Sequence, residues 1–403
     1  LVDWQQCAAG LERSARDLRL VVGRSSAGNR LRWTGDTSQG VDPSAWAEGL
    51  EAVEQALDGA LDALSTVSEI APDFARLHER AATLAQRVRG FAGAAAVGSV
   101  RWLDVSTHLR LIESPLDIAK AVQERLLKAD AEPDPEAVPR SWIFTSATLG
   151  DDARLSWFTE PCGLGEAEVL RVASPFDYST QAALYVPRQL PKPNDPAHTG
   201  AVAALVQRAV QRLGGRTLVL TTTLRALRAI GEQLQARFDG TGEVEVLVQG
   251  QWPKRRLIER FREGAADGRP GCVLVASASF WEGIDVPGDA LELVIIDKLP
   301  FPPPGDPLVE ARGQRLQEQG RSPFNDYFVP EAAVALKQGA GRLIRRETDR
   351  GLLVVCDTRL ATMGYGRRLL AALPPMRRLQ DEAEFEAALE SLAPPGTASE
   401  QIL

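Results

Sequence analysis

The chain is too long for one compact core and has the composition of an ordinary globular protein. It has 403 residues, of which 44% are hydrophobic and 25% are charged, whereas single cores stop growing at about 250–300 residues. No apolar run approaches the roughly 18 residues that cross a bilayer, so we expect no association with a membrane. The net charge of −8 argues mildly against a nucleic-acid binder, although a local cationic groove would be enough for such binding.

The cysteines and the first residue narrow the expectation further. The four cysteines are too scattered for a metal-binding run or an iron–sulfur signature, so we expect mostly buried, reduced thiols, no metal site and a cytoplasmic protein. They are Cys7, Cys162, Cys272 and Cys356. The chain opens on Leu1 rather than Met, from which we expect a piece of a longer polypeptide.

In chain order, residues 1–94 are predicted to be helical, and the pattern then changes. Three apolar stripes at helical spacing indicate helix packing without chemistry, and a polar, glycine-rich stretch predicts a loop between the first two. Further along, shorter apolar patterns predict a strand pair and, after an acidic linker, one more short strand. The predicted helices are 11–22, 46–64, 74–91 and 114–127, the loop is 25–40, and the strands are 100–105, 108–112 and 141–145.

From residue 200 onward, predicted strands and helices alternate. Apolar strands without polar alternation, separated by helices, indicate an α/β fold in which helices cover both faces of a parallel sheet. In such sheets ligands bind at the carboxyl ends of the strands, so the turns after the strands are where we expect functional residues. The predicted strands are 217–220, 244–248, 272–276, 293–296 and 351–356, and the helices are 201–213, 224–238, 254–261 and 331–339.

The strongest chemical signal is the segment 338–345. Gln338, Arg342 and Arg345 recur at spacings of four and three, which would place an amide and two guanidiniums on one helical face. Two like charges on one face call for an anion, and the planar guanidinium matches phosphate oxygens. These three are therefore the candidate catalytic residues of a phosphoryl transfer, with Gly341 beside the nucleotide. The alternative is a solvated helix face with surface arginines.

The second signal is the segment 277–285, directly after a predicted buried strand. Gly283 would let the backbone approach a ligand. Two acidic residues flank it as acceptors for a ribose or an arginine, and two aromatic residues either stack on bases or pack under the loop. The acidic residues are Glu282 and Asp285, and the aromatic ones are Phe280 and Trp281.

Hydroxyl groups follow two of the predicted strands. Thr221, Thr222 and Thr223 lie where a strand ends and a helix begins. They would cap the helix, bind a nucleic-acid phosphate together with backbone N–H groups, or do both. Ser146 and Thr148 repeat this pattern after the strand predicted at 141–145.

Taken together, these segments resemble the later helicase motifs of the XPD/Rad3-like group of superfamily 2. Two of them, Phe280–Asp285 and Gln338–Arg345, are similar to the bacterial DinG and YoaA branch. The likeness runs in the family's order from about Val100 to Pro375. The four segments are Thr145-Ser-Ala-Thr-Leu149, Phe280-Trp-Glu-Gly-Ile-Asp285, Asp297-Lys-Leu-Pro-Phe301 and Gln338-Gly-Ala-Gly-Arg-Leu-Ile-Arg345.

The resemblance implies a role for each group of residues. Arg342 and Arg345 would be arginine fingers that reach ATP from the second RecA-like domain, and Gly283 and Asp285 would lie beside the nucleotide. Thr221 to Thr223 would contact single-stranded DNA, and Ser146 and Thr148 would link the ATP state to domain closure. Residues 1–94 would belong to a helical arch domain, 95–150 to the end of the first RecA-like domain, and 151–403 to the second.

Several parts that the family uses are absent from the sequence. The phosphate-binding loop of the family contains a Gly-Lys pair, and this chain has no Gly-Lys dipeptide. The resemblance implies that most contacts to ATP and Mg²⁺, and a [4Fe-4S] cluster, belong to a preceding half. We therefore expect a monomeric 5′-to-3′ helicase that acts on single-stranded DNA in replication or repair, of which this chain alone does not hydrolyse ATP.

Two other functions remain open at this point. The arch helices and the acidic tail from Asp381 to Leu403 could dock a replication or repair partner without motor activity. A different two-layer α/β enzyme, such as a nucleotide-sugar transferase, would bind its nucleotide within this chain alone and would tolerate Arg342→Ala.

Overall fold

The chain divides into two compact units in the computed structural model. The structure describes residues 2–23, 29–127, 141–150, 152–266, 268–277, 280, 286 and 290–393. The first unit comprises 1–137, 161–163 and 303–323, and the second comprises 138–160, 164–302 and 324–403. The second unit holds most of the predicted functional residues.

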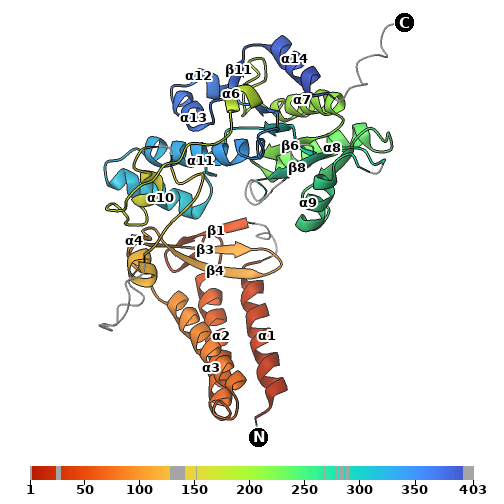
Figure 1. Cartoon of the computed structure of the whole chain (residues 1–403). Coiled ribbons are helices and arrows are strands. Elements are labelled where there is room, and N and C mark those ends of the chain that lie inside the picture. The colour runs from red at the N-terminus through yellow and green to blue at the C-terminus, as the bar shows by residue number, and fades with distance from the viewer. Residues whose placement is uncertain are drawn as a thin grey trace. The chain divides into compact units, whose positions relative to one another are not determined.

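The first unit packs three long helices against a small antiparallel sheet (Figure 1). Trp46 and Leu50 fill its core, each with 2% of its surface exposed. A later segment of the chain also belongs to this unit and contributes α10 (Pro307–Glu318). The other helices are α1 (Trp4–Val21), α2 (Pro43–Ser65), α3 (Pro72–Ala92) and α4 (Ala119–Val122), which continues as the π-type turn η1 (Gln123–Leu127). The sheet order is β2 (Thr37–Ser38), β1 (Asn29–Thr34), β3 (Ser99–Val105) and β4 (Leu109–Pro115).

Strand β1 lies where we predicted a loop, so that prediction was wrong. It pairs antiparallel with β3, with Leu31 opposite Leu103. Polar and apolar residues do alternate over Arg30 to Trp33, which is the pattern of a half-buried strand, but the polar, glycine-rich residues around it hid this short signal. The strand pair predicted at 100–105 and 108–112 is confirmed as β3 and β4.

The second unit is built on a seven-stranded sheet in which every neighbouring pair is parallel. This confirms the predicted α/β, RecA-like fold. The sheet order is β11 (Arg377–Leu379), β5 (Ala182–Tyr185), β10 (Gly351–Val355), β9 (Leu293–Ile296), β6 (Thr217–Thr221), β8 (Cys272–Ser277) and β7 (Glu245–Val248). The helices are α5 (Ser156–Thr159), α6 (Tyr178–Gln181), α7 (His198–Leu213), α8 (Leu224–Phe238), α9 (Lys254–Glu263), α11 (Val329–Ala340), α12 (Arg359–Thr362), α13 (Gly366–Ala372) and α14 (Glu382–Leu392), and the π-type turn η4 (Phe324–Phe328) precedes α11.

Helices cover both faces of this sheet because its strands are apolar on both faces. Leu218 and Leu220 of β6 point into a cluster with α9, α11 and α13. Val219, between them, points into a second cluster with α7, α8 and α14. All three side chains are completely buried, as expected for a central strand of a parallel sheet.

The strand predicted at 141–145 does not form, and that prediction was wrong. No described strand pairs with this segment, and its apolar side chains lie in solvent, with Ile143 85% and Trp142 43% exposed. An apolar segment becomes a strand only when a neighbouring strand accepts its backbone hydrogen bonds. The described part of the chain offers it no such neighbour.

Candidate functional site

The three threonines lie at the carboxyl end of β6, as predicted. Thr221 is fully buried, and its hydroxyl donates to the carbonyl of Ala276 at 3.2 Å. Thr223 is exposed and is the N-cap of α8, since its Oγ1 accepts the N–H of Ala226 at 3.1 Å. The capping role is therefore present in the structure. It leaves Thr222 and Thr223 at the surface beside the start of a 15-residue helix.

Asp297 fixes the middle threonine from the neighbouring strand β9. Its Oδ1 accepts the backbone N–H of Thr222 at 2.9 Å, and its backbone carbonyl lies 3.0 Å from Nε2 of the buried His198. Burial raises the pKa of Asp297 to about 6, although the hydrogen bond from Thr222 and the charge of Lys298 act in the opposite direction. A carboxyl group so placed holds the end of β6 rigid, at the cost of burying a charge.

The adjoining strand ends are tied together in the same way. Gln249 Oε1, after β7, accepts both the backbone N–H of Ser277 at 2.7 Å and its hydroxyl at 3.0 Å. Phe280 is 2% exposed, and Lys254 Nζ lies 4.8 Å from its ring centroid. This burial supports packing under the loop, one of the two interpretations of that ring. The predicted residues Trp281, Glu282, Gly283 and Asp285 lie outside the described residues.

The candidate catalytic residues lie on α11 and in the loop after it. Gln338 is in the last turn of α11, which ends at Ala340 with Gly341 as its C-cap. Arg342 and Arg345 therefore do not continue a helical face with Gln338, and that part of the prediction was wrong. The helix stops because the next two apolar residues turn inward: Leu343 and Ile344 are each 1% exposed. Arg342 is half-buried and Arg345 is exposed.

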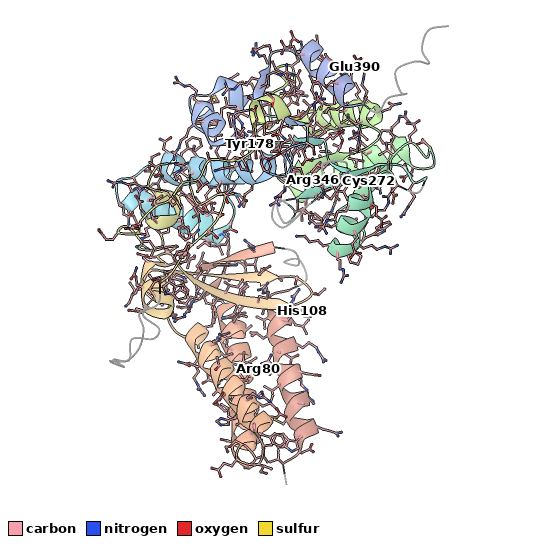
Figure 2. All side chains as sticks on the ribbon, viewed as in Figure 1. Arg80, His108, Tyr178, Cys272, Arg346 and Glu390 are labelled. Atoms are coloured by element: carbon pink, nitrogen blue, oxygen red, sulfur yellow. The ribbon has the colours of Figure 1, made fainter. Side chains whose placement is uncertain are left out.

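Two polar residues that the sequence did not indicate shape this loop. The Asp349 carboxylate accepts the backbone N–H groups of Arg345 at 2.8 Å and Arg346 at 2.9 Å. The side-chain amide of Gln181 donates to carbonyl oxygens on the opposite side of the loop. Arg346, which is labelled in Figure 2, marks the position of this loop. No motif spacing relates Gln181 to this loop, because only the pairing of β5 with β10 brings them together.

The structure brings Gln338 together with Thr148, which is 190 positions away in the sequence. Gln338 Nε2 lies 3.4 Å from Thr148 Oγ1. The Thr148 hydroxyl lies 3.3 Å from that of Ser146, which also accepts the N–H of Thr148 at 3.1 Å. These residues are the two hydroxyl-bearing positions that we had predicted as a pair. Their contact links the segment 141–150 to α11.

The predicted residues fall into two groups at opposite edges of one sheet. Thr221 is the last residue of β6 and pairs with Ser277, the last residue of β8, so both lie at the carboxyl edge. The loop of Arg345 instead precedes β10, and Gln181, which holds this loop, precedes β5. These two strands start side by side, with Gly351 opposite Ala182. Our expectation that all functional residues lie at the carboxyl ends is therefore wrong for the arginines. The chain returns through α11 and places them at the amino edge.

Metal-ligand clusters and membrane spans are not found among the residues described. No group of three or more histidine, cysteine, aspartate or glutamate side chains could hold a metal ion in that part of the chain. Cys272 and Cys356 are buried in the sheet, and burial raises the pKa of both thiols. Among the same residues, no helix combines the length and apolar character needed to cross a bilayer.

Comparison with known proteins identifies the family of this architecture. The family described as helicase C-terminal domain matches residues 206–376, a range that contains both edge groups. The ATP-dependent DNA helicase YoaA of Escherichia coli is 37% identical over 94% of this chain and 56% of its own length. Residues 206–376 belong to the helicase C-terminal domain family, and the chain is similar to helicases named YoaA and DinG. The ATP-dependent helicase DinG of Mycobacterium tuberculosis is 37% identical over 62% of this chain and 37% of its own length.

The similarity to YoaA covers both units, and that to solved structures supports the same fold. A solved structure of an XPD helicase aligns with 94% of this chain and 62% of its own, at 14% identity and a TM-score of 0.52. Sequence identity this low shows a shared fold only. The chain spans about half the length of the YoaA proteins that it matches, 56% and 54% for those of Escherichia coli and Haemophilus influenzae.

Proposed function

We propose that this chain supplies the second motor domain and part of the arch of an ATP-dependent DNA helicase of the YoaA/DinG type. The observation that supports this most directly is the placement of Arg342 and Arg345. Both lie in a loop at one edge of the parallel sheet, next to the contact between Gln338 and Thr148. The helicase C-terminal domain family matches a range that contains both arginines.

The guanidinium groups of Arg342 and Arg345 would act on ATP held mainly by another domain. Guanidinium groups stabilise the charge that develops on the transferred phosphoryl group, and removing one lowers turnover about 10³–10⁵-fold. Since the chain has no Gly-Lys dipeptide, most contacts to ATP and its Mg²⁺ would come from the first RecA-like domain. The remaining contacts to the nucleotide would come from Glu282, Gly283, Asp285 and Gly341. A [4Fe-4S] cluster would likewise belong to that other part of the protein.

Thr222 and Thr223 would contact the backbone of single-stranded DNA at the other edge. They lie at the surface beside the first turn of α8, where backbone N–H groups and the helix dipole favour a phosphate. Residues 1–94 would form part of the arch, 95–150 would complete the first RecA-like domain, and 151–403 would form the second. The exposed Trp142 and Ile143 support this division, because the first RecA-like sheet would cover them.

Movement along DNA would proceed from 5′ to 3′. Closure of two RecA-like domains on ATP, followed by reopening, would alternate the grip at the threonines. Ser146 and Thr148 would couple the closure of the two domains to Gln338. The relatives are named as DNA helicases, and this proposal extends that activity to the complete protein that contains this chain.

The test is a DNA-stimulated ATPase assay on the complete gene product. Arg342→Ala and Arg345→Ala should each lower kcat by about 10³-fold or more. Arg350→Ala, a change of an exposed arginine near the same loop, is the matched control and should leave kcat unchanged. The chain 1–403 alone should show no turnover. Normal turnover by either loop variant would refute the assignment of that arginine, and turnover by the isolated chain would refute the division of the site.

A partner-docking function finds less support. Part of the acidic tail is the helix α14, whose Phe385 and Leu389 are buried against the sheet at 2% and 0% exposure. Residues 381–384 form its exposed start. A pull-down with and without residues 376–403 would remove a strand and a helix of the fold, so a loss of binding there needs a folding control.

A further inference from the structure

The loop that carries Arg345 is fastened from outside by a single side chain. Gln181, the last residue of α6, extends its amide across the loop. Its Nε2 donates to the carbonyl oxygens of Arg346 at 2.9 Å, Glu347 at 3.0 Å and Asp349 at 3.0 Å. A carboxamide has only two N–H groups, so the three oxygens share them. One side chain thus satisfies three carbonyls within four residues.

The loop is fastened from inside as well. Asp349 is 6% exposed, and its carboxylate accepts the N–H groups of Arg345 and Arg346. Leu343 and Ile344 anchor the preceding residues in the core. The Asp349 carboxylate thus accepts from N–H groups of the loop, and the Gln181 amide donates to carbonyls of the loop. Together with the backbone bond from the Asp349 N–H to the Arg346 carbonyl at 3.2 Å, these two side chains hold the loop in place.

Gln181 is itself held by the sheet. Its backbone N–H donates to the carbonyl of Asp177 at 2.9 Å. The next residue, Ala182, lies opposite Gly351 in the paired strands β5 and β10. The amide therefore starts from a backbone position that cannot move without disturbing the sheet, and it fixes the loop to that frame.

We propose that Gln181 is a positioning residue for Arg345. Its amide sets where the Arg345 guanidinium meets the transferred phosphoryl group, and it does not touch that group itself. The proposal rests on the proposed function, because only a phosphoryl transfer gives Arg345 such a task. Displacing a catalytic group by about 1 Å can lower a rate about 10²-fold, which is the scale of effect to expect from a slack loop.

The experiment compares two substitutions of Gln181 in the complete protein. Gln181→Met keeps the length and removes both donors, and should lower kcat for ATP about 10–100-fold while KM stays within about twofold. Gln181→Lys keeps N–H donors at similar reach and should retain kcat within about threefold of the unchanged protein. Gln235→Met, which removes an exposed amide that bonds only to Gln251 in the described structure, is the matched control and should leave kcat unaltered.

A double-mutant cycle with Arg345→Lys separates positioning from a general loss of folding. If Gln181 acts through Arg345, then Gln181→Met should add less than about twofold to the loss caused by Arg345→Lys. Independent losses that multiply would overturn the proposal, and so would a kcat for Gln181→Met within about twofold of normal. Full turnover by Arg345→Ala would instead refute the proposed function, so the two failures are distinguishable.

Discussion

Replacing Asp297 by Asn tests whether the end of β9 carries a buried and costly charge. Asp297 is 1% exposed, and burial raises its pKa from 3.8 to about 6. Because the folded-state pKa lies above the unfolded one, this carboxyl stabilises the fold below the unfolded pKa. That contribution is lost as the pH rises through about 6. Asn does not titrate, and its amide oxygen can still accept the N–H of Thr222.

The size of the effect follows from the same two pKa values. They differ by about two units, which corresponds to about 3 kcal/mol in total at about 1.4 kcal/mol for each unit. At about pH 5 the unfolded carboxyl is ionised and the folded one is still protonated, so about half of this stabilisation remains there and almost none at about pH 8. The stability of Asp297→Asn relative to the unchanged chain should therefore rise by about 1–2 kcal/mol between these two pH values.

Urea unfolding followed by circular dichroism at both pH values measures this difference. Only the change in the gap between the two proteins matters, because the other titrating groups affect both proteins alike. Parallel pH profiles would refute the reasoning and would mean that Asp297 is as well solvated by its hydrogen bonds as it is in the unfolded chain.

Two further substitutions test the packing of each unit. Arg101 is 4% exposed, and its guanidinium pairs with Glu113 and donates to the carbonyls at the end of α3. The substitution Arg101→Leu removes this guanidinium. It should destabilise the first unit by about 3–5 kcal/mol, seen as faster hydrogen exchange in β3 with no change in β6. Gly351→Ala would put a Cβ 2.5 Å from Leu343 Cδ1 and 2.8 Å from the carbonyl of Glu292. It should cost about 1–3 kcal/mol and lower ATP turnover by moving the arginine loop, whereas Gly59→Ala, with open space at that position, should do neither.

The parallel sheet could be predicted from the sequence because its strands carry the signal locally. The apolar runs 217–220 and 293–296 recur in the structure as β6 and β9, and the helix predicted at 224–238 has the same bounds as α8. Strand β5 gave no usable signal, since Ala182-Ala-Leu-Tyr185 is short and weakly apolar. It becomes a strand because β10 and β11 pair with it on either side.

The site could be predicted as a set of residues but not as a geometry. Gln338, Arg342 and Arg345 stand at helical spacing, yet α11 ends at Ala340, because burying Leu343 and Ile344 outweighs continuing the helix. The residue that fastens the arginine loop, Gln181, is 164 positions away from Arg345 and belongs to no motif. Contacts of this kind follow from strand order, which spacing along the chain does not determine.

Strand β9 explains how the two groups of residues stay at a fixed distance. Glu292, just before it, lies beside Gly351 at the amino edge, and Asp297, just after it, holds Thr222 at the carboxyl edge. The four residues between them span about 13 Å, are completely buried and are paired on both sides. A hydrogen-bonded central strand cannot lengthen or slip without breaking both ladders. We therefore expect the second unit to move as one body, with Gly351→Ala impairing ATP turnover while DNA affinity at the threonine edge is retained.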